Sequence, residues 1–311
     1  MRARVLAQAA LLLGLTAMSS SADAWCRLTT RRASVIGECS SNGEQLMWCS
    51  GCSGMSPSIE DLPAELSLET FSMEATAATL RWAGVQCPGD LMDPPAFELR
   101  IIEPTRVRSG LNRTGSNANA LWFNSEWRSD ALHRSNTIAI TIVSFDTATG
   151  AILDADIEFN LRSEINPDGM VFGTGDPTPG TADLGTILTH EMGHALGMGH
   201  SEFERAVMFP TAGTGERRNT PTEDDTAGLC DIYPLLATER RPQCDPPGAT
   251  RRPDLVCNPV PYGGLAPSND GGRVLGGCSV PSVRPASVPT SALYLVAVAL
   301  SALVLRKRKP R

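Results

Sequence analysis

Apolar side chains recur at helical spacing between residues 68 and 82. Intervals of three or four positions place one stripe of side chains on a single helix face: Leu68, Phe71, Ala75, Ala78 and Trp82. Ser67 precedes this stripe, and a serine hydroxyl at such a position can cap the free N–H groups of the first turn. The pattern predicts an amphipathic helix that begins after Ser67.

Three later segments have the pattern of β-strands. Residues 97–102 alternate between apolar and polar positions, and residues 138–145 and 152–159 are two further strands joined by a turn-rich segment at 146–150. The region from about residue 46 to residue 236 is long enough for one domain with its own core. The chain is therefore expected to mix helices and strands in one domain.

Three of the four histidines of the chain lie between residues 190 and 200. His190 and His194 are four positions apart, so on a helix their side chains project from the same face, one turn apart. Asp183 can cap such a helix, and Gly197 stands where a helix end favours a residue with positive φ. After that turn the chain can reverse direction and bring the His200 side chain close to those of His190 and His194.

The spacing H-E-x-x-H-x-x-G-x-x-H is typical of a catalytic zinc site. His190, His194 and His200 would hold one Zn²⁺ and leave a fourth position open for water. Zinc lowers the pKa of a bound water toward neutrality. Glu191 is suited to take the proton of that water and pass it to a leaving amine.

This motif resembles the zinc motif of the metzincins, and Ser201, directly after the third histidine, resembles the matrixins among them. Residues 206–210 (Ala-Val-Met-Phe-Pro) are similar to the matrixin Met-turn, which implies that Met208 forms a hydrophobic floor beneath the zinc. Pro210 stands where sister families carry a tyrosine ligand, so three protein ligands are expected. The resemblance implies a zinc endopeptidase that acts on proteins or peptides.

The resemblance also implies the fold, an α/β (α+β) metzincin domain with a twisted mixed sheet, an active-site helix, the Met-turn and a C-terminal helix. The pattern Thr220-Pro221-Thr222-Glu223 is typical of a capping box, so we expect the last helix to start there and to reach Cys230. Residues 154–159 resemble the matrixin strand that precedes the active-site region. Their acidic side chains are either ligands of a calcium ion (Ca²⁺) or a solvated strand edge, and we favour the solvated edge.

Two features of animal matrix metalloproteases are absent from the sequence. Their structural zinc needs three more histidines, whereas only His133 remains, so we expect one zinc per chain and interpret His133 as a surface residue. The propeptide cysteine-switch motif does not occur, and the segment Cys87-Pro88-Gly89-Asp90 is similar to it only superficially.

Both ends of the chain have the composition of targeting segments. Residues 1–24 combine a charged start, an apolar core and an A-x-A site, which predicts a signal peptide and an exported protein. Residues 291–305 are uncharged and apolar, would span about 22 Å as a helix against a hydrocarbon core of about 30 Å, and precede a basic end. Together with Cys278, they resemble the sorting tails of myxobacterial surface proteins, with processing at Cys278; a plain tail anchor is the alternative.

The sequence thus divides into five parts: a signal peptide (1–24), a cysteine-containing N-terminal extension or start of the domain (25–58), a matrixin-like domain (59–236), a Pro/Gly-rich spacer (237–290), and a hydrophobic segment with a basic tail (291–311). Nine cysteines in an exported chain predict disulfides. With Cys278 set aside, the others are enough for four bridges, whose connectivity the sequence does not specify.

The net charge of −7, with no basic stripe before the terminal tail, argues against a nucleic-acid partner. The expected partners are a protein or peptide substrate and, through the C-terminal tail, a membrane; the sequence does not predict the oligomeric state. Two alternatives stay open, a non-catalytic surface or adhesion protein on a metzincin fold and a zinc amidase acting on non-peptide cell-wall material. Because Glu191 and all three histidines are present, we favour the endopeptidase.

Overall fold

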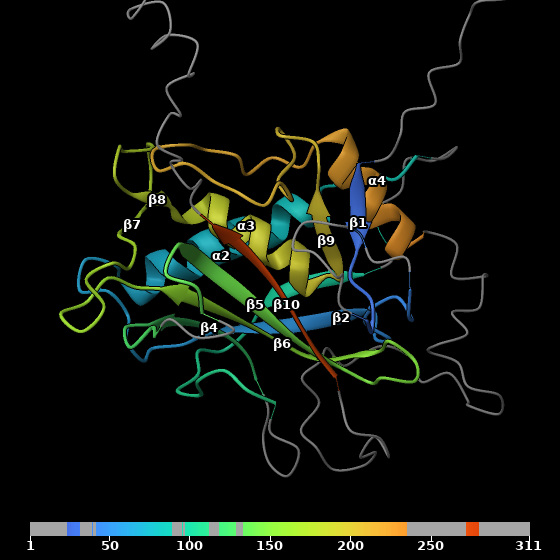
Figure 1. Ribbon diagram of the computed structural model, residues 1–311, viewed down its shortest axis with the longest axis horizontal. Helices are drawn as coiled ribbons and strands as arrows, with labels where there is room; N and C mark the ends of the chain where they lie inside the picture. Colours follow the sequence, from blue (N-terminus) through green and yellow to red (C-terminus); the bar gives the residue numbers. More distant parts are fainter. Residues whose placement is uncertain are drawn as a thin grey trace, which may run out of the picture. The chain divides into compact units, whose positions relative to one another are not determined.

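A six-stranded mixed sheet forms the centre of the structure (Figure 1). Its strands are β2 (Cys52–Pro57), β3 (Glu98–Ile101), β4 (Asn119–Asn124), β5 (Thr137–Phe145), β6 (Ile152–Asn160) and β10 (Gly272–Ser279), in the spatial order β10-β5-β6-β4-β2-β3. β5 is antiparallel to both of its neighbours, and the other pairs are parallel. The computed structural model describes residues 24–31, 39, 42–88, 95, 97–111, 118–128, 133–234 and 272–279.

Two helices cover one face of this sheet. α2 (Leu68–Ala83) and α3 (Leu184–Ala195) contact each other, and α3 also contacts β5 and β6 (Figure 1). α4 (Glu223–Ile232) packs against the small sheet of β1 (Trp25–Arg27) and β9 (Met198–Ser201), and a short pair, β7 (Phe172–Gly173) and β8 (Ala182–Asp183), precedes α3. The architecture is the metzincin-type α/β fold that the sequence predicts.

Helix α2 begins where the sequence predicts. Ser67 is its N-cap and accepts a hydrogen bond from the backbone N–H of Thr70 at 3.0 Å. Phe71 is fully buried, and its ring centroid lies 5.0 Å from that of Phe123 on β4, which in turn lies 4.9 Å from that of Phe159 on β6. Burial of each such ring stabilises the fold by about 1.5–3 kcal/mol, so this cluster fixes α2 on the sheet.

The predicted strands are confirmed as β3, β5 and β6, with small differences at their ends. The sequence pattern did not indicate β2 and β4. β2 contains Gly54 and Pro57, residues that are depleted in strands, and a Cβ on Gly54 would lie 2.7 Å from the Ile102 side chain. β4 is buried at every position, so it lacks the alternation that marks a half-exposed strand.

The segment before residue 59 supports the C-terminal end of α3. Trp48 is fully buried, and its indole N–H donates to the carbonyl oxygen of Ala195 at 2.8 Å. The Tyr233 hydroxyl accepts from the backbone N–H of Trp48 at 3.1 Å and donates to the Leu196 carbonyl at 3.0 Å. Together with β2 inside the main sheet, these contacts make this segment part of the packed core.

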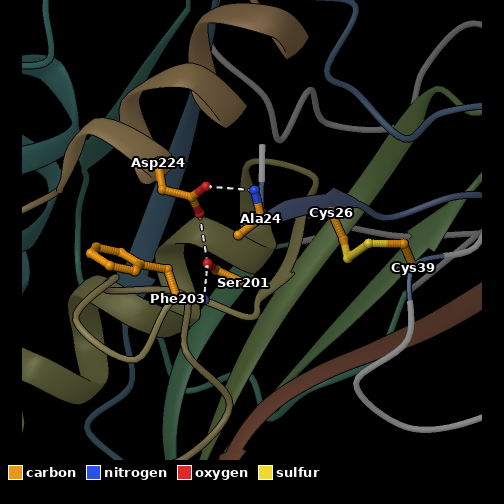
Figure 2. Close-up of a disulfide and its surroundings, with 6 residues drawn as sticks. All are labelled: Ala24, Cys26, Cys39, Ser201, Phe203 and Asp224. Atoms are coloured by element: carbon orange, nitrogen blue, oxygen red, sulfur yellow. Dashed lines mark hydrogen bonds between the residues drawn. A yellow bond between two sulfur atoms is a disulfide. The ribbon is translucent and has the colours of Figure 1, made fainter. Parts of the chain in front are cut away.

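The described chain contains disulfides at both short and long sequence separations. Cys26 is bonded to Cys39 beside β1 (Figure 2), and Cys87, after α2, is bonded to Cys230 in α4. Cys49 and Cys52 are also disulfide-bonded. Because Cys87 is in a bridge, it offers no free thiolate in this structure.

The predicted targeting segments lie almost wholly outside the described residues. This holds for residues 1–23 of the expected signal peptide and for the hydrophobic segment and basic tail at 291–311. Of the expected spacer, 237–290, the structure describes only residues 272–279, as β10. Among the described helices, none has the length and apolar character needed to cross a membrane.

The acidic side chains of β6 are buried, so the expectation of a solvated strand edge is wrong. Asp154, Asp156 and Glu158 are 0%, 0% and 4% exposed. They share one face of β6, which the loop at 109–110, Asn124 and His133 contact. Asp156 accepts hydrogen bonds from the N–H groups of Ala120 and Gly110 at 2.8 and 2.6 Å. Burial and the neighbouring Asp154 carboxyl raise the pKa of Asp156 well above its usual range. The calcium ion stays a prediction.

We expect the Asp154→Asn variant to be more stable than the parent chain at pH 8. The pKa of the Asp156 carboxyl is higher in the folded state than in the unfolded state, where it is about 4. The folded state therefore becomes less stable as the pH rises from about 4 toward the pKa of the folded state. Asparagine removes the charge that opposes ionisation of Asp156, so Tm should be higher than that of the parent chain at pH 8, and this advantage should vanish below about pH 4. Thermal unfolding across this range measures the effect, with the exposed Asp168→Asn as control. A lower Tm for Asp154→Asn at pH 8 would contradict the repulsion.

Candidate metal centre

Helix α3 carries the first half of the candidate centre. Asp183 caps it, as predicted, and accepts hydrogen bonds from the backbone N–H and the hydroxyl of Thr186 at 2.8 and 2.6 Å. The helix ends at Ala195, and Gly197 has the predicted positive φ, 94°. A Cβ on Gly197 would collide with the carbonyl oxygen of Leu46, so glycine is required by both conformation and space. The turn leads directly into β9.

The structure brings three histidines together at this turn. One ligand nitrogen from each of His190, His194 and His200 lies within 4.8 Å of the others. His190 and His194 are buried, with their Nε2 atoms 3.1 Å apart, and His200 is half-buried. Over the part of the chain that the structure describes, no other group of three or more metal-ligating side chains converges in this way.

Backbone carbonyls orient two of the imidazoles. Nδ1 of His190 lies 2.7 Å from the carbonyl oxygen of Val207, and Nδ1 of His194 lies 2.8 Å from that of Met198. Because a carbonyl oxygen only accepts, each Nδ1 carries a proton and each Nε2 carries a lone pair. Two facing lone pairs repel each other unless a cation lies beside them. Neutral imidazoles held in this way are a fitting donor set for Zn²⁺.

Burial keeps two of these histidines in the neutral form. Burial first, and then the neighbouring His200, lower the pKa of His190 from 6.5 to about 3. Burial and the neighbours His190 and His200 lower the pKa of His194 well below its usual value. Since a metal binds the neutral imidazole, protons compete weakly for both side chains near pH 7.

Met208 lies directly against α3. It is fully buried, and a Cβ on Gly193 would collide with its sulfur atom. The carbonyl of the preceding residue, Val207, is the group that orients His190. The segment at 207–208 therefore supports the histidines through one packed side chain and one hydrogen bond.

Glu191 is fully buried and in contact with β5. The hydroxyl of Thr141 lies 2.7 Å from the Oε2 atom of Glu191 and 3.0 Å from its backbone carbonyl oxygen. Sequence reasoning did not single out Thr141. The only signal was a polar residue inside a predicted strand, and its contact with Glu191 depends on how β5 packs against α3.

Asp225 connects the last helix to the segment that holds Met208. Its carboxylate accepts from the N–H groups of Val207 and Met208 at 2.9 and 3.0 Å, and from the N–H and hydroxyl of Thr222, both at 2.8 Å. The capping box is therefore Thr222 with Asp225, and α4 begins at Glu223, later than predicted. The Asp225 pairing prevails because the same carboxylate also satisfies two buried N–H groups.

Ser201 joins β9 to α4 (Figure 2). Its hydroxyl donates to Asp224 at 2.6 Å and accepts from the backbone N–H of Phe203 at 3.0 Å. The other carboxylate oxygen of Asp224 accepts from the backbone N–H of Ala24 at 2.9 Å. These bonds hold the strand that carries His200 against α4 and the N-terminal strand.

His133 is separate from this centre, and the prediction that it is a surface residue is wrong. Its side chain is half-buried, with Nε2 3.2 Å from Oε2 of Glu158 and its ring 4.6 Å from the Trp127 ring. Burial raises the pKa of Glu158, but hydrogen bonds from His133, Ser109 and Asn124 outweigh it and leave that pKa below its usual value. The fourth histidine thus stabilises a buried carboxylate.

Known proteins resemble part of this chain. Residues 124–234 match the family model of the matrixins. Metalloendoproteinase 5-MMP of Arabidopsis thaliana is 30% identical over 121 residues, which are 34% of this chain and 33% of that protein. Human matrilysin is 44% identical over 54 residues (17% and 20%), and metalloendoproteinase 1 of Glycine max is 31% identical over 93 residues (29% and 30%). The chain spans about a third or less of the length of these relatives. The match and the fold together support a matrixin-like metzincin.

Proposed function

We propose that this protein is a zinc-dependent endopeptidase. The observation that carries the proposal is the convergence of His190, His194 and His200 beside the buried carboxylate of Glu191. The zinc ligands would be the imidazole nitrogens of these three histidines. Zinc bound there supplies a Lewis acid that polarises a peptide carbonyl and makes a water molecule nucleophilic at neutral pH.

Three side chains would assist the metal in this reaction. Glu191 would take the proton of the attacking water and deliver it to the leaving amine, a role that requires a carboxylate held in place. The Thr141 hydroxyl acts as its positioning group, because it lies 2.7 Å from Oε2. Met208 would exclude water from beneath the histidines and restrict their movement, since its side chain is fully buried and packs against Gly193.

The expected location is outside the cytoplasm. Disulfides persist in oxidising compartments, and the described chain contains Cys26–Cys39 and Cys87–Cys230. The signal-peptide pattern of residues 1–24 agrees with export. Cys278, followed by an apolar run and a basic end, remains the proposed processing point of a surface-sorting tail.

We expect one tightly bound zinc per chain and loss of casein cleavage when a chelator removes it. A stoichiometric amount of zinc should restore the activity, because the donor set is neutral and its His190 and His194 imidazoles are already oriented. Metal analysis after gel filtration, followed by a cleavage assay, measures both effects. His194→Ala should lose metal and activity, whereas His133→Ala, outside the cluster, should keep both. Two tightly bound zinc ions per chain would contradict the expectation of a single zinc, and full cleavage without metal would overturn the proposed function.

A further inference from the structure

Strand β10 covers the whole length of the edge of β5. Each residue from Gly272 to Ser279 faces a residue of β5 in antiparallel register, from Phe145 to Thr137. Figure 1 shows β10 as the red-brown arrow beside β5, with α3 behind it. Without β10, β5 would be the outermost strand at this end of the sheet. The C-terminal part of the chain therefore fills a sheet edge that the domain would otherwise expose.

This edge is the one beside the candidate catalytic carboxylate. Gly276 faces Thr141 in the register, and the Thr141 hydroxyl contacts Glu191. β10 also contacts α3, the helix that carries His190 and His194. The other edge of the sheet, β3, is separated from β5 by β6, β4 and β2. An extended chain that reaches Glu191 by pairing with the sheet must use the position that β10 occupies.

Extended peptides commonly bind proteins by adding a strand to an open sheet edge, where main-chain hydrogen bonds provide the affinity. We propose that residues 272–279 are an intramolecular occupant of the peptide-binding edge and hold the enzyme in an inhibited state. The proposal rests on the proposed endopeptidase function. It assigns to the C-terminal segment a regulatory role in which a substrate must displace β10 before it reaches Glu191.

The composition of β10 suits a strand that can be displaced. Gly272, Gly276 and Gly277 are three of its eight residues, and glycine inside a strand weakens it. Because β10 belongs to the same chain as β5, its pairing is intramolecular and does not depend on protein concentration, whereas a peptide substrate must compete from solution. If β10 is in place in nine molecules of ten, the apparent affinity for a peptide falls about tenfold.

The test breaks the pairing in the full-length chain. Val274→Pro with Leu275→Pro must remove a hydrogen bond to β5, because successive N–H groups of a strand point to opposite sides. Asn269→Pro, before the strand, is the control. Hydrogen exchange at the backbone amides of β5 measures whether β10 is still paired with β5. The value of kcat/KM on a quenched fluorescent peptide measures how readily a substrate reaches the active site.

The double variant should lose amide protection in β5 and gain about tenfold or more in kcat/KM, while Asn269→Pro behaves as the parent chain. A synthetic peptide with the sequence of residues 270–280 should then inhibit the double variant more strongly than the parent. An unchanged kcat/KM with exposed β5 amides, or retained protection of β5, would overturn the inhibitory role. If no variant cleaves peptide although β5 is exposed and zinc is bound, the proposed endopeptidase function itself fails. This outcome differs from those that would contradict only the inhibitory role of β10.

Discussion

Replacing Glu191 by glutamine should reduce peptide hydrolysis by about 10²–10⁴-fold while one zinc stays bound, because an amide cannot take up a proton from water but leaves the three histidines unchanged. Glutamine keeps the length of the side chain and can still contact the Thr141 hydroxyl, which lies 2.7 Å from Oε2 in the parent chain. The measurement is kcat/KM on a fluorescent peptide together with metal analysis of the same preparation.

The matched control is Glu164→Gln, which makes the same chemical change at an exposed position and should be as active as the parent. If Glu191→Gln keeps its zinc and cleaves peptide at the parental rate, another group moves the proton and the mechanism is wrong. If zinc is lost as well, the residue supports the metal and the loss of activity has a different cause.

Asp225→Ala should have the largest effect on stability of the changes considered. Its fully buried carboxylate accepts four hydrogen bonds, two from Thr222 and one each from the N–H groups of Val207 and Met208. Alanine leaves buried donors without acceptors, each at a cost of about 1–3 kcal/mol, so a total loss of about 3–5 kcal/mol is expected. Chemical denaturation measures this loss.

The same substitution should weaken zinc binding by about 10–100-fold, because Val207 orients His190 through its carbonyl oxygen. Competition with a chromophoric chelator measures the affinity under conditions in which the variant is still folded. Glu223→Gln, at an exposed position of the same helix turn, should change neither quantity appreciably. A parental zinc affinity in a destabilised Asp225→Ala chain would show that the Met208 segment keeps its place without this carboxylate.

The features that the sequence predicted correctly are those that short stretches of chain determine. The Ser67 cap of α2, the Asp183 cap of α3 and the positive φ of Gly197 follow from the conformational preferences of single residues and their near neighbours. The convergence of the three histidines could be predicted in the same way, because a helix followed by one turn brings their side chains together.

The features that were missed depend on contacts between distant segments. Thr141 and Glu191 are 50 positions apart, and only the packing of β5 on α3 joins them. The burial of Asp156 and Glu158 depends on distant segments, the loop at 109–110 and His133, which cover their face of the sheet, so the sequence alone wrongly suggested a solvated strand. β10 lies in a segment whose proline and glycine content is typical of a spacer, and its strand forms only by pairing with β5.

Cys87 and Cys230 are 143 positions apart in the sequence, and both α3 and the Met208 segment lie inside the covalent loop that their bridge closes. A single cut anywhere within the loop would leave the two fragments joined by the disulfide. Such a nicked molecule would run as one species on a gel without reductant and separate only after reduction. The bridge would thus keep the segments that carry the histidine cluster covalently joined to the rest of the domain after a cut in a surface loop.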